Sequence, residues 1–267
     1  MRLAWCTDIH LNFLEADELT RFCDAIATHP DAPEAVVITG DISEAPGLSE
    51  HLAFLERELD RPIYFVLGNH DYYRGSIQSV RAAMRALSST SRHLRWMPAA
   101  GVVRLGTDVA LVGHDGWADG RLGDYARSRV LLNDYLHIDE LAYLPKGERL
   151  LKLNALGDEA AAYFRETLPS ALDGYAHVVV ATHVPPFSAA CVQDGKVSDD
   201  DWLPHFSCHA VGEALLEVMA RYADRTMTVL CGHTHGEGTA VIRPNLTVHT
   251  GHAHYGAPVV QRVLELS

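Results

Sequence analysis

The stretch Pro62-Ile-Tyr-Phe-Val-Leu-Gly-Asn-His-Asp71 joins a short apolar run to a polar ending. Residues 62–67 are apolar and rich in β-branched and aromatic types, which is typical of a strand buried on both faces. Gly68-Asn69-His70-Asp71 follows where that strand should end. A buried strand that delivers an amide, an imidazole and a carboxylate at its end is the feature from which fold and chemistry can be predicted.

The same arrangement recurs four more times along the chain. An apolar run precedes a polar group at Leu3–Cys6 with Thr7-Asp8-Ile9-His10, Ala35–Thr39 with Gly40-Asp41, Val178–Ala181 with Thr182-His183, and Thr226–Cys231 with Gly232-His233-Thr234-His235. Val109–Gly113 is a further strand of this type. Open α/β sheets place their ligand crevice outside the carboxyl ends of the strands, so we expect these polar groups to meet there.

Apolar residues recur at helical spacing between the predicted strands. The apolar stripes are Leu19, Phe22, Cys23 and Ile26; Leu48, Leu52, Leu55 and Leu59; Ile77, Val80, Met84 and Leu87, after a candidate N-cap at Ser76; and Val211, Leu215, Val218, Met219 and Tyr222. Packing in the core explains these stripes. The alternation of strand and helix predicts an α/β fold. Residues 246–249 and 258–266 form two strands without a helix between them, which predicts a partly antiparallel sheet system.

The composition is that of a globular protein. Of the 267 residues, 48% are hydrophobic and 21% charged, and no linker divides them, so we expect a single domain over 1–267. A formal charge of 22 − 35 = −13 disfavours stable binding to nucleic acids or anionic membranes. The five cysteines form no C-x-x-C pair, and no apolar run is long enough to span a membrane. A cytoplasmic location is therefore expected.

The five polar strand ends together predict a metal site. Singly each is weak, because Gly-Asp after a strand is most often a turn and a lone histidine is usually a satisfied polar group. In Asp8-x-His10 and His233-x-His235, the spacing puts both side chains on one side of an extended segment. Carboxylate, imidazole and amide oxygen form a ligand set without thiolate, which suits Mn, Fe, Ni, Zn or Mg. Five such groups on separate strands favour a metal site over a set of turns.

In the order D-x-H, G-D, G-N-H-D, a lone H and G-H-x-H, the motifs resemble those of the calcineurin-like metallophosphoesterase superfamily from Asp8 to His235. The resemblance implies an α/β sandwich of four layers, αββα, in which helices flank two mixed sheets and two divalent metal ions lie between loops. By position it implies that Asp8, His10 and His235 bind one metal, that Asn69, His183 and His233 bind the other, and that Asp41 bridges both. His70 takes the place of the family's catalytic histidine.

These residue types are consistent with hydrolysis of a phosphoric ester. A carboxylate such as Asp41 can hold two dications about 3.5–4 Å apart. A water between them would be acidified and attack phosphorus, and the cations supply positive charge that an acidic chain lacks. His70 would protonate the leaving group. Asp71 is a second candidate catalytic residue, placed to orient His70 and raise its pKa against the dications, which lower it.

Departures from named subfamilies narrow the expected substrate. The protein phosphatases of the superfamily carry G-D-x-V-D-R-G, whereas this chain has Gly40-Asp-Ile-Ser-Glu-Ala-Pro46, and the tyrosine ligand of purple acid phosphatases is missing after Asp41. The pattern is most similar to the group of class III cyclic-nucleotide phosphodiesterases and related bacterial enzymes. This implies a phosphodiesterase acting on a small or nucleotide-like phosphoester. A phosphomonoesterase and a metal-bearing interaction scaffold are the alternatives, and the acidic charge disfavours a DNA nuclease.

One irregular region bears on the substrate. Residues 115–156 are rich in Gly, Asp, Arg and Tyr with weak periodicity, which predicts an irregular insertion or lid. The candidate substrate contacts, from the start of this region and from the turn after Asn69, are Tyr72, Arg74, His114, Trp117 and Arg121. The alternative, that Trp117 and the tyrosines anchor long loops to the core, is favoured over direct contact.

A second G-H-x-H group, Gly251-His252-Ala253-His254, follows another strand-like run. We favour His233 and His235 as metal ligands, because Thr226–Cys231 is the more apolar strand and the order of the motifs fits. The later pair is interpreted as a loop at the end of the last sheet, with His254 near the pocket.

Overall fold

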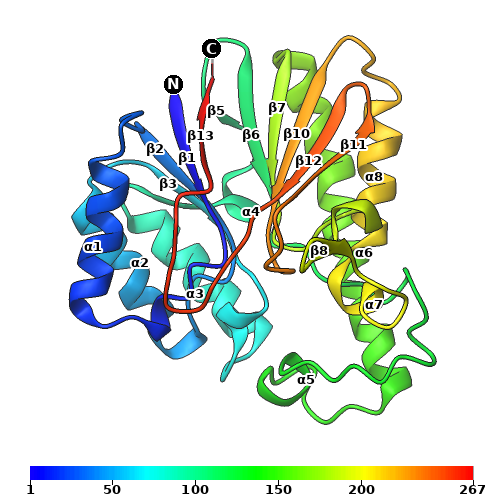
Figure 1. Ribbon diagram of the computed structural model, residues 1–267. Coiled ribbons are helices and arrows are strands. Elements are labelled where there is room, and N and C mark those ends of the chain that lie inside the picture. Colours follow the sequence, from blue (N-terminus) through cyan, green and yellow to red (C-terminus); the bar gives the residue numbers. More distant parts are fainter. Residues whose placement is uncertain (267) are drawn as a thin grey trace.

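The computed structural model describes residues 1–266, in which two β-sheets pack face to face with helices outside both (Figure 1). The first sheet has the order β13-β1-β2-β3-β4 and the second β11-β12-β10-β7-β6-β5. Inner strands are parallel, whereas β13, β11 and β5 pair antiparallel at sheet edges. The strands are β1 Arg2–Cys6, β2 Ala35–Thr39, β3 Ile63–Val66, β4 Leu94–Trp96, β5 Val103–Arg104, β6 Val109–Gly113, β7 His177–Ala181, β10 Thr226–Cys231, β11 Gly238–Arg243, β12 Leu246–Thr250 and β13 Arg262–Glu265. The predicted αββα sandwich of mixed sheets is confirmed.

Each central strand is buried on both faces, so its alternate residues belong to two different cores. In β1, Leu3 and Trp5 pack between the two sheets, whereas Ala4 and Cys6 pack with the helices outside the first sheet. In β7, Val179 lies in the core between the sheets. This double burial explains why the strands are continuous apolar runs in the sequence.

Helices α1, α2 and α3 cover the outer face of the first sheet, and α6 and α8 cover that of the second (Figure 1). The predicted N-cap of α3 is confirmed, because Ser79 N donates a hydrogen bond of 3.0 Å to Ser76 Oγ. The helices are α1 Ala16–Ala27, α2 Ala45–Leu59, α3 Ile77–Thr90, α4 Met97–Ala100, α5 Asp134–His137, α6 Lys146–Gly174, α7 Leu203–Phe206 and α8 His209–Met219, with short 3-10 turns η1 Leu11–Phe13, η2 His70–Tyr72 and η3 Ser188–Ala190. Within residues 1–266, no helix combines the length and apolar character needed to cross a membrane.

The prediction that residues 115–156 are irregular is wrong for the last part of that stretch, because the 29-residue helix α6 begins at Lys146. The buried face of α6 repeats every three or four residues, but small side chains such as Gly157 and Ala161 make up much of it. Ala161 packs against α8 in a buried cluster with Ala210 and Ala214, whereas Gly157 makes room for Asp119. A stripe of small residues has little apolar area, so the sequence signal was weak.

Two segments outside the regular layers lie near the carboxyl ends of the parallel strands. One, 114–145, contains α5, which Figure 1 shows below the two sheets, and a bridge between Gly75 and Ile138 ties it to the turn after β3. The other, 182–208, contains η3, α7 and a hairpin of β8 (Val192–Gln193) and β9 (Lys196–Val197). These segments are positioned to surround whatever lies at the strand ends.

Replacing Phe164 by Ala should lower the free energy of unfolding by about 3–5 kcal/mol, because its ring is fully buried among residues of α6, α8 and the second sheet. The matched control is Leu151→Ala on the same helix, where the side chain is 70% exposed and the change should stay within about 0.5 kcal/mol. Urea denaturation followed by circular dichroism measures both. Equal losses in the two variants would contradict the packing described for α6.

Candidate active site

The polar ends of β1, β2 and β10 bring four predicted ligands around one point. Asp8, His10, Asp41 and His235 each offer one ligand atom, and these atoms all lie within 4.8 Å of one another. The Nε2 atoms of His10 and His235 are 3.3 Å apart, and His235 Nε2 lies 3.4 Å from Asp8 Oδ1. His10 Nε2 lies 3.8 Å from Asp41 Oδ2. Two carboxylates and two imidazoles at these distances form the donor set of a cation site.

The ends of β3, β7 and β10 form a second group beside the first. Asn69 Oδ1 lies 3.1 Å from His183 Nε2 and 2.9 Å from His233 Nδ1. The other oxygen of Asp41, Oδ1, lies 3.4 Å from His183 Nε2. Asp41 therefore faces both groups, one with each carboxylate oxygen.

The protons of the second group are determined by its outer hydrogen bonds. His183 Nδ1 lies 2.8 Å from the carbonyl oxygen of Thr39, and His233 Nε2 lies 2.9 Å from that of His205. A carbonyl only accepts, so these nitrogens carry the protons. Burial lowers the pKa of both imidazoles, that of His233 to about 3, so the other nitrogens present lone pairs to Asn69 Oδ1. Acceptors that face one another without a proton between them are the arrangement that a metal ion stabilises.

The two buried carboxylates, Asp8 and Asp41, also indicate that a cation stabilises this arrangement. Burial, with the nearby charges of Asp8 and Asp71, raises the pKa of Asp41 well above its ordinary value. Burial also acts to raise the pKa of Asp8, but its hydrogen bond with His235 and the neighbouring histidines outweigh this and lower it. A buried carboxylate beside a second one needs either a proton or a cation.

Left-handed backbone is concentrated at the predicted metal ligands. Positive φ angles occur at Asp8 (48°), His10 (41°), Asp41 (51°), His233 (71°) and His235 (58°). The expectation that D-x-H and H-x-H are extended segments is therefore wrong, because these residues have left-handed backbone beyond the strand ends, from which each side chain reaches one of the two groups. Non-glycine residues of this kind are strained, and such strain clusters at functional sites.

Two glycines allow the carboxylates to lie where they do. A Cβ on Gly68 would lie 2.1 Å from Asp41 Oδ1, and one on Gly232 would lie 1.9 Å from Asp8 Oδ2. Both distances are far below van der Waals contact, so each carboxylate occupies the space that any other residue type would fill. The G-N-H-D and G-H-x-H motifs need glycine for this close approach.

A cavity of about 330 Å³ opens onto the two groups. It is lined by Asp41, Asn69, His70, Tyr73, Leu132, Asn133, Asp134, Gln193, Phe206, His233, Thr234, His235 and Tyr255. The His70 ring stacks on Tyr73 with centroids 4.3 Å apart, and its Nε2 lies 4.0 Å from Asp41 Oδ2. Burial and the neighbouring His10 lower the pKa of His70 to about 2, so it is a neutral imidazole at pH 7.

The sequence matches the model of the calcineurin-like phosphoesterase family over residues 1–237. The chain belongs to this family. It is therefore a metal-dependent phosphoester hydrolase of a family that uses a dinuclear divalent metal centre. The two groups that share Asp41 fit such a centre, since both offer only nitrogen and oxygen atoms, and in the second group no proton lies between Asn69 Oδ1 and the two histidine nitrogens.

Solved structures share the fold of this phosphoesterase at low sequence identity. A phosphopantetheinyl hydrolase from Mycobacterium tuberculosis is 13% identical, with a TM-score of 0.65 over 94% of this chain and 89% of that one. A dimetal phosphatase from Danio rerio is 16% identical, with a TM-score of 0.57 over 94% of this chain and 86% of that one. No curated protein matches the sequence. At these identities the likeness shows the fold alone.

The structure places Asp71 differently from the prediction that it orients His70. Asp71 is fully buried and accepts hydrogen bonds from the backbone N–H groups of Ile42, Ser43 and Gly68 at 2.8–2.9 Å. Residues 70 and 71 are consecutive in the 3-10 turn η2, where successive side chains point about 120° apart. Asp71 therefore joins the loops after β2 and β3, which carry Asp41 and Asn69.

The candidate substrate contacts Tyr72 and Trp117 do not line the cavity, because both are buried in the core. Their ring centroids are 5.4 Å apart, and Tyr72 OH donates a hydrogen bond of 2.9 Å to Asp115. Asp115 also accepts from Leu67 N and from the indole of Trp96. This region anchors the loop after β3, as the alternative interpretation predicted.

The other three candidates also lie away from the cavity. Arg74 is largely exposed and forms an ion pair with Glu44. His114 is buried and accepts a hydrogen bond from a backbone N–H two residues later. Arg121 forms ion pairs with Asp119 and Asp158. None of the five candidate substrate contacts lines the cavity, and the residues that do line it are the better candidates.

Several cavity residues were not found by sequence reasoning. The ring centroid of Tyr255 lies 4.5 Å from that of His10 and 5.2 Å from that of His235. Asp134 accepts a hydrogen bond from Asn69. The second G-H-x-H group precedes Tyr255, but its His254 is exposed and belongs to neither ligand group. The repeated motif was a signal that this loop reaches the site, although its histidines do not form the cluster.

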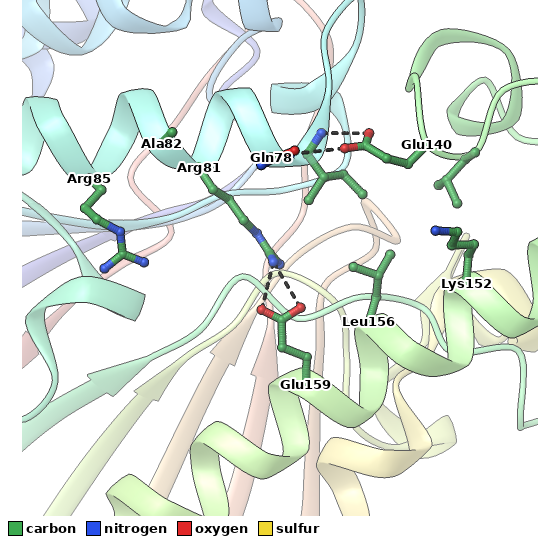
Figure 2. Close-up of a pocket in the computed structure, with 10 residues that line it drawn as sticks. Gln78, Arg81, Ala82, Arg85, Glu140, Lys152, Leu156 and Glu159 are labelled. Atoms are coloured by element: carbon green, nitrogen blue, oxygen red, sulfur yellow. Dashed lines mark hydrogen bonds and ion pairs between the residues drawn. The ribbon is translucent and has the colours of Figure 1, made fainter.

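A larger cavity, of about 450 Å³, lies between α3 and α6 (Figure 2). Arg81 Nη1 donates to both carboxylate oxygens of Glu159 at 2.9 and 3.0 Å. Glu140 accepts from the backbone N–H groups of Ile77 and Gln78 at the start of α3. The acidic side chains of this cavity are bonded to the protein itself, and none of the predicted ligands lines it.

The variant Gly232→Ala should lose metal binding, because the added methyl group overlaps the Asp8 carboxylate. Gly147→Ala is the matched control, since no atom lies within 4 Å of its Cβ position. Metal per chain, measured by plasma mass spectrometry after dialysis against Mn²⁺, should fall in the first variant and stay unchanged in the second. Full metal content in Gly232→Ala would contradict the close approach of Asp8.

Proposed function

We propose that this phosphoesterase hydrolyses small-molecule phosphodiesters at the cavity beside the two ligand groups. In this proposal one metal position comprises Asp8, His10 and His235, the other comprises Asn69, His183 and His233, and Asp41 bridges them. The observation that carries the proposal is the cavity lining: among the described residues that form it, none is lysine or arginine. The donor set suits Mn, Fe, Ni, Zn or Mg.

The charge of the substrate follows from that lining. A phosphomonoester carries close to two negative charges at pH 7, since its second pKa is about 6, whereas a diester carries one. Arginine is the side chain that best binds additional phosphate charge. In its place the cavity presents Tyr73, Leu132, Phe206 and Tyr255, which suit an uncharged organic group on a second ester oxygen. Both features favour a diester.

The roles of the chain's own residues follow from their positions. Two dications bound by these ligands would supply positive charge at the phosphoryl oxygens and an acidified water as nucleophile. His70 lines the cavity, and its stacking on Tyr73 and edge contact with His10 restrict the orientation of the ring. A phosphate anion beside His70 would favour its protonated form, against burial and the dications, which favour the neutral form, and in this proposal that protonated imidazole gives the leaving oxygen its proton.

Metal-loaded protein should hydrolyse bis-p-nitrophenyl phosphate faster than p-nitrophenyl phosphate, because the lining favours a singly charged ester. Release of p-nitrophenolate is measured with chelator-stripped protein and after reloading with Mn²⁺. Asp41→Ala, which removes the bridging carboxylate, is the inactive control. Faster monoester hydrolysis would favour a phosphomonoesterase, and metal binding without any hydrolysis would favour an interaction scaffold.

His70→Ala should lower kcat by about 10²–10⁴-fold while both metal ions remain bound, because His70 is assigned to proton transfer and not to metal binding. The loss should be greater for diphenyl phosphate than for bis-p-nitrophenyl phosphate, since phenolate is the poorer leaving group. His254→Ala, outside both ligand groups, is the control. If His70→Ala instead loses metal, His70 is a ligand and the proposed role is wrong.

A further inference from the structure

The short helix α5 lies apart from both helical layers, yet two of its side chains are buried beside the metal ligands. Asp134 and Tyr135 are only 4% and 2% exposed, whereas Leu136 on the same turn is 38% exposed. Arg149 of α6 lies over the Tyr135 ring, 4.0 Å from its centroid, and so holds α5 against the body of the protein. A helix of this length has little stability of its own, so its burial depends on these contacts.

Asp134 determines which way the Asn69 amide points. Asp134 Oδ1 accepts hydrogen bonds from Asn69 Nδ2 at 2.8 Å and from the hydroxyl of Tyr73 at 2.7 Å. With its NH2 group held by a carboxylate, the amide must turn Oδ1 toward His183 and His233. The oxygen is thereby presented as a ligand, and an amide flip would instead present a donor.

Tyr135 acts on a second ligand through His205. The Tyr135 hydroxyl lies 2.6 Å from His205 Nδ1, and Ser128 Oγ lies 3.1 Å from His205 Nε2, so both ring nitrogens of His205 are held. The backbone carbonyl of the same residue accepts the Nε2 proton of His233. This bond leaves Nδ1 of His233 unprotonated and facing Asn69.

We propose that Asp134 and Tyr135 are positioning residues for the Asn69–His183–His233 metal position, so that α5 controls occupancy of that position and not of the other. The inference rests on the ligand assignment of the proposed function. The side-chain hydrogen bonds of the two residues go to Asn69, Tyr73 and His205, and none goes to Asp8, His10 or His235. Because Asp134 also lines the cavity, a metal bound at this position would in turn stabilise α5 and the cavity wall that it forms.

The test measures metal binding and not activity. In Asp134→Ala, equilibrium dialysis against Mn²⁺ should show one ion bound as in the wild type and the second bound about 10–100-fold more weakly. Asp134→Asn should restore binding, because both hydrogen bonds end on a single oxygen, which asparagine retains. Tyr135→Phe should weaken the same position. Asp139→Ala, an exposed carboxylate in the same segment, is the matched control.

Three outcomes would overturn the proposal: two ions bound to Asp134→Ala at wild-type affinity, equal weakening of both ions, or failure of Asp134→Asn to restore binding. Circular dichroism confirms that each variant is folded. In addition, Mn²⁺ should slow amide hydrogen exchange of residues 128–138 in the wild type. An unchanged rate would show that metal binding does not stabilise α5. Wild-type protein that binds two ions without hydrolysing any ester would disprove the proposed function while leaving this inference intact.

Discussion

At the centre of the candidate site, acceptor atoms face one another without a proton between them. Asn69 Oδ1 faces unprotonated nitrogens of His183 and His233, and the buried carboxylates of Asp8 and Asp41 belong to one cluster. Such contacts are unfavourable in a medium of low dielectric constant unless a cation lies between the atoms. The protein must therefore hold these side chains against their mutual repulsion.

The surroundings supply that restraint through rigid elements. The predicted ligands follow strands that are buried on both faces, and the buried carboxylate of Asp71 ties the loops after β2 and β3 to each other. Five of the predicted ligands have left-handed backbone, which persists in non-glycine residues only where the surrounding structure enforces it. Rigidity of this kind suits hydrolysis, because preorganised charge needs no rearrangement as the reaction proceeds.

The two irregular segments contribute ligand orientation as well as cavity wall. Asp134 from one segment holds Asn69, and the carbonyl of His205 from the other holds His233. The segments contact each other through Tyr135 and His205, so the region predicted as a lid also supports the site. On the proposed assignment, the substrate cavity and one metal position form a single unit.

The central strands of both sheets, their polar ends and the types of donor atom could be predicted from the sequence, whereas β4, β5 and β11 could not. These are local properties, since a strand buried on both faces must be apolar throughout and its polar residues can only come at its end. The burial of Tyr72 and Trp117 was the favoured alternative from the sequence, but the role of Asp71 in tying two loops together and the approach of Asp134 and Tyr255 to the site emerge from the packing of distant segments. The tertiary structure also showed α6, part of whose buried face consists of small residues, with Ala161 packed against Ala210 and Ala214 of α8. The direction of a side chain beyond a strand end depends on left-handed turns and on packing between distant segments, and no local pattern encodes either.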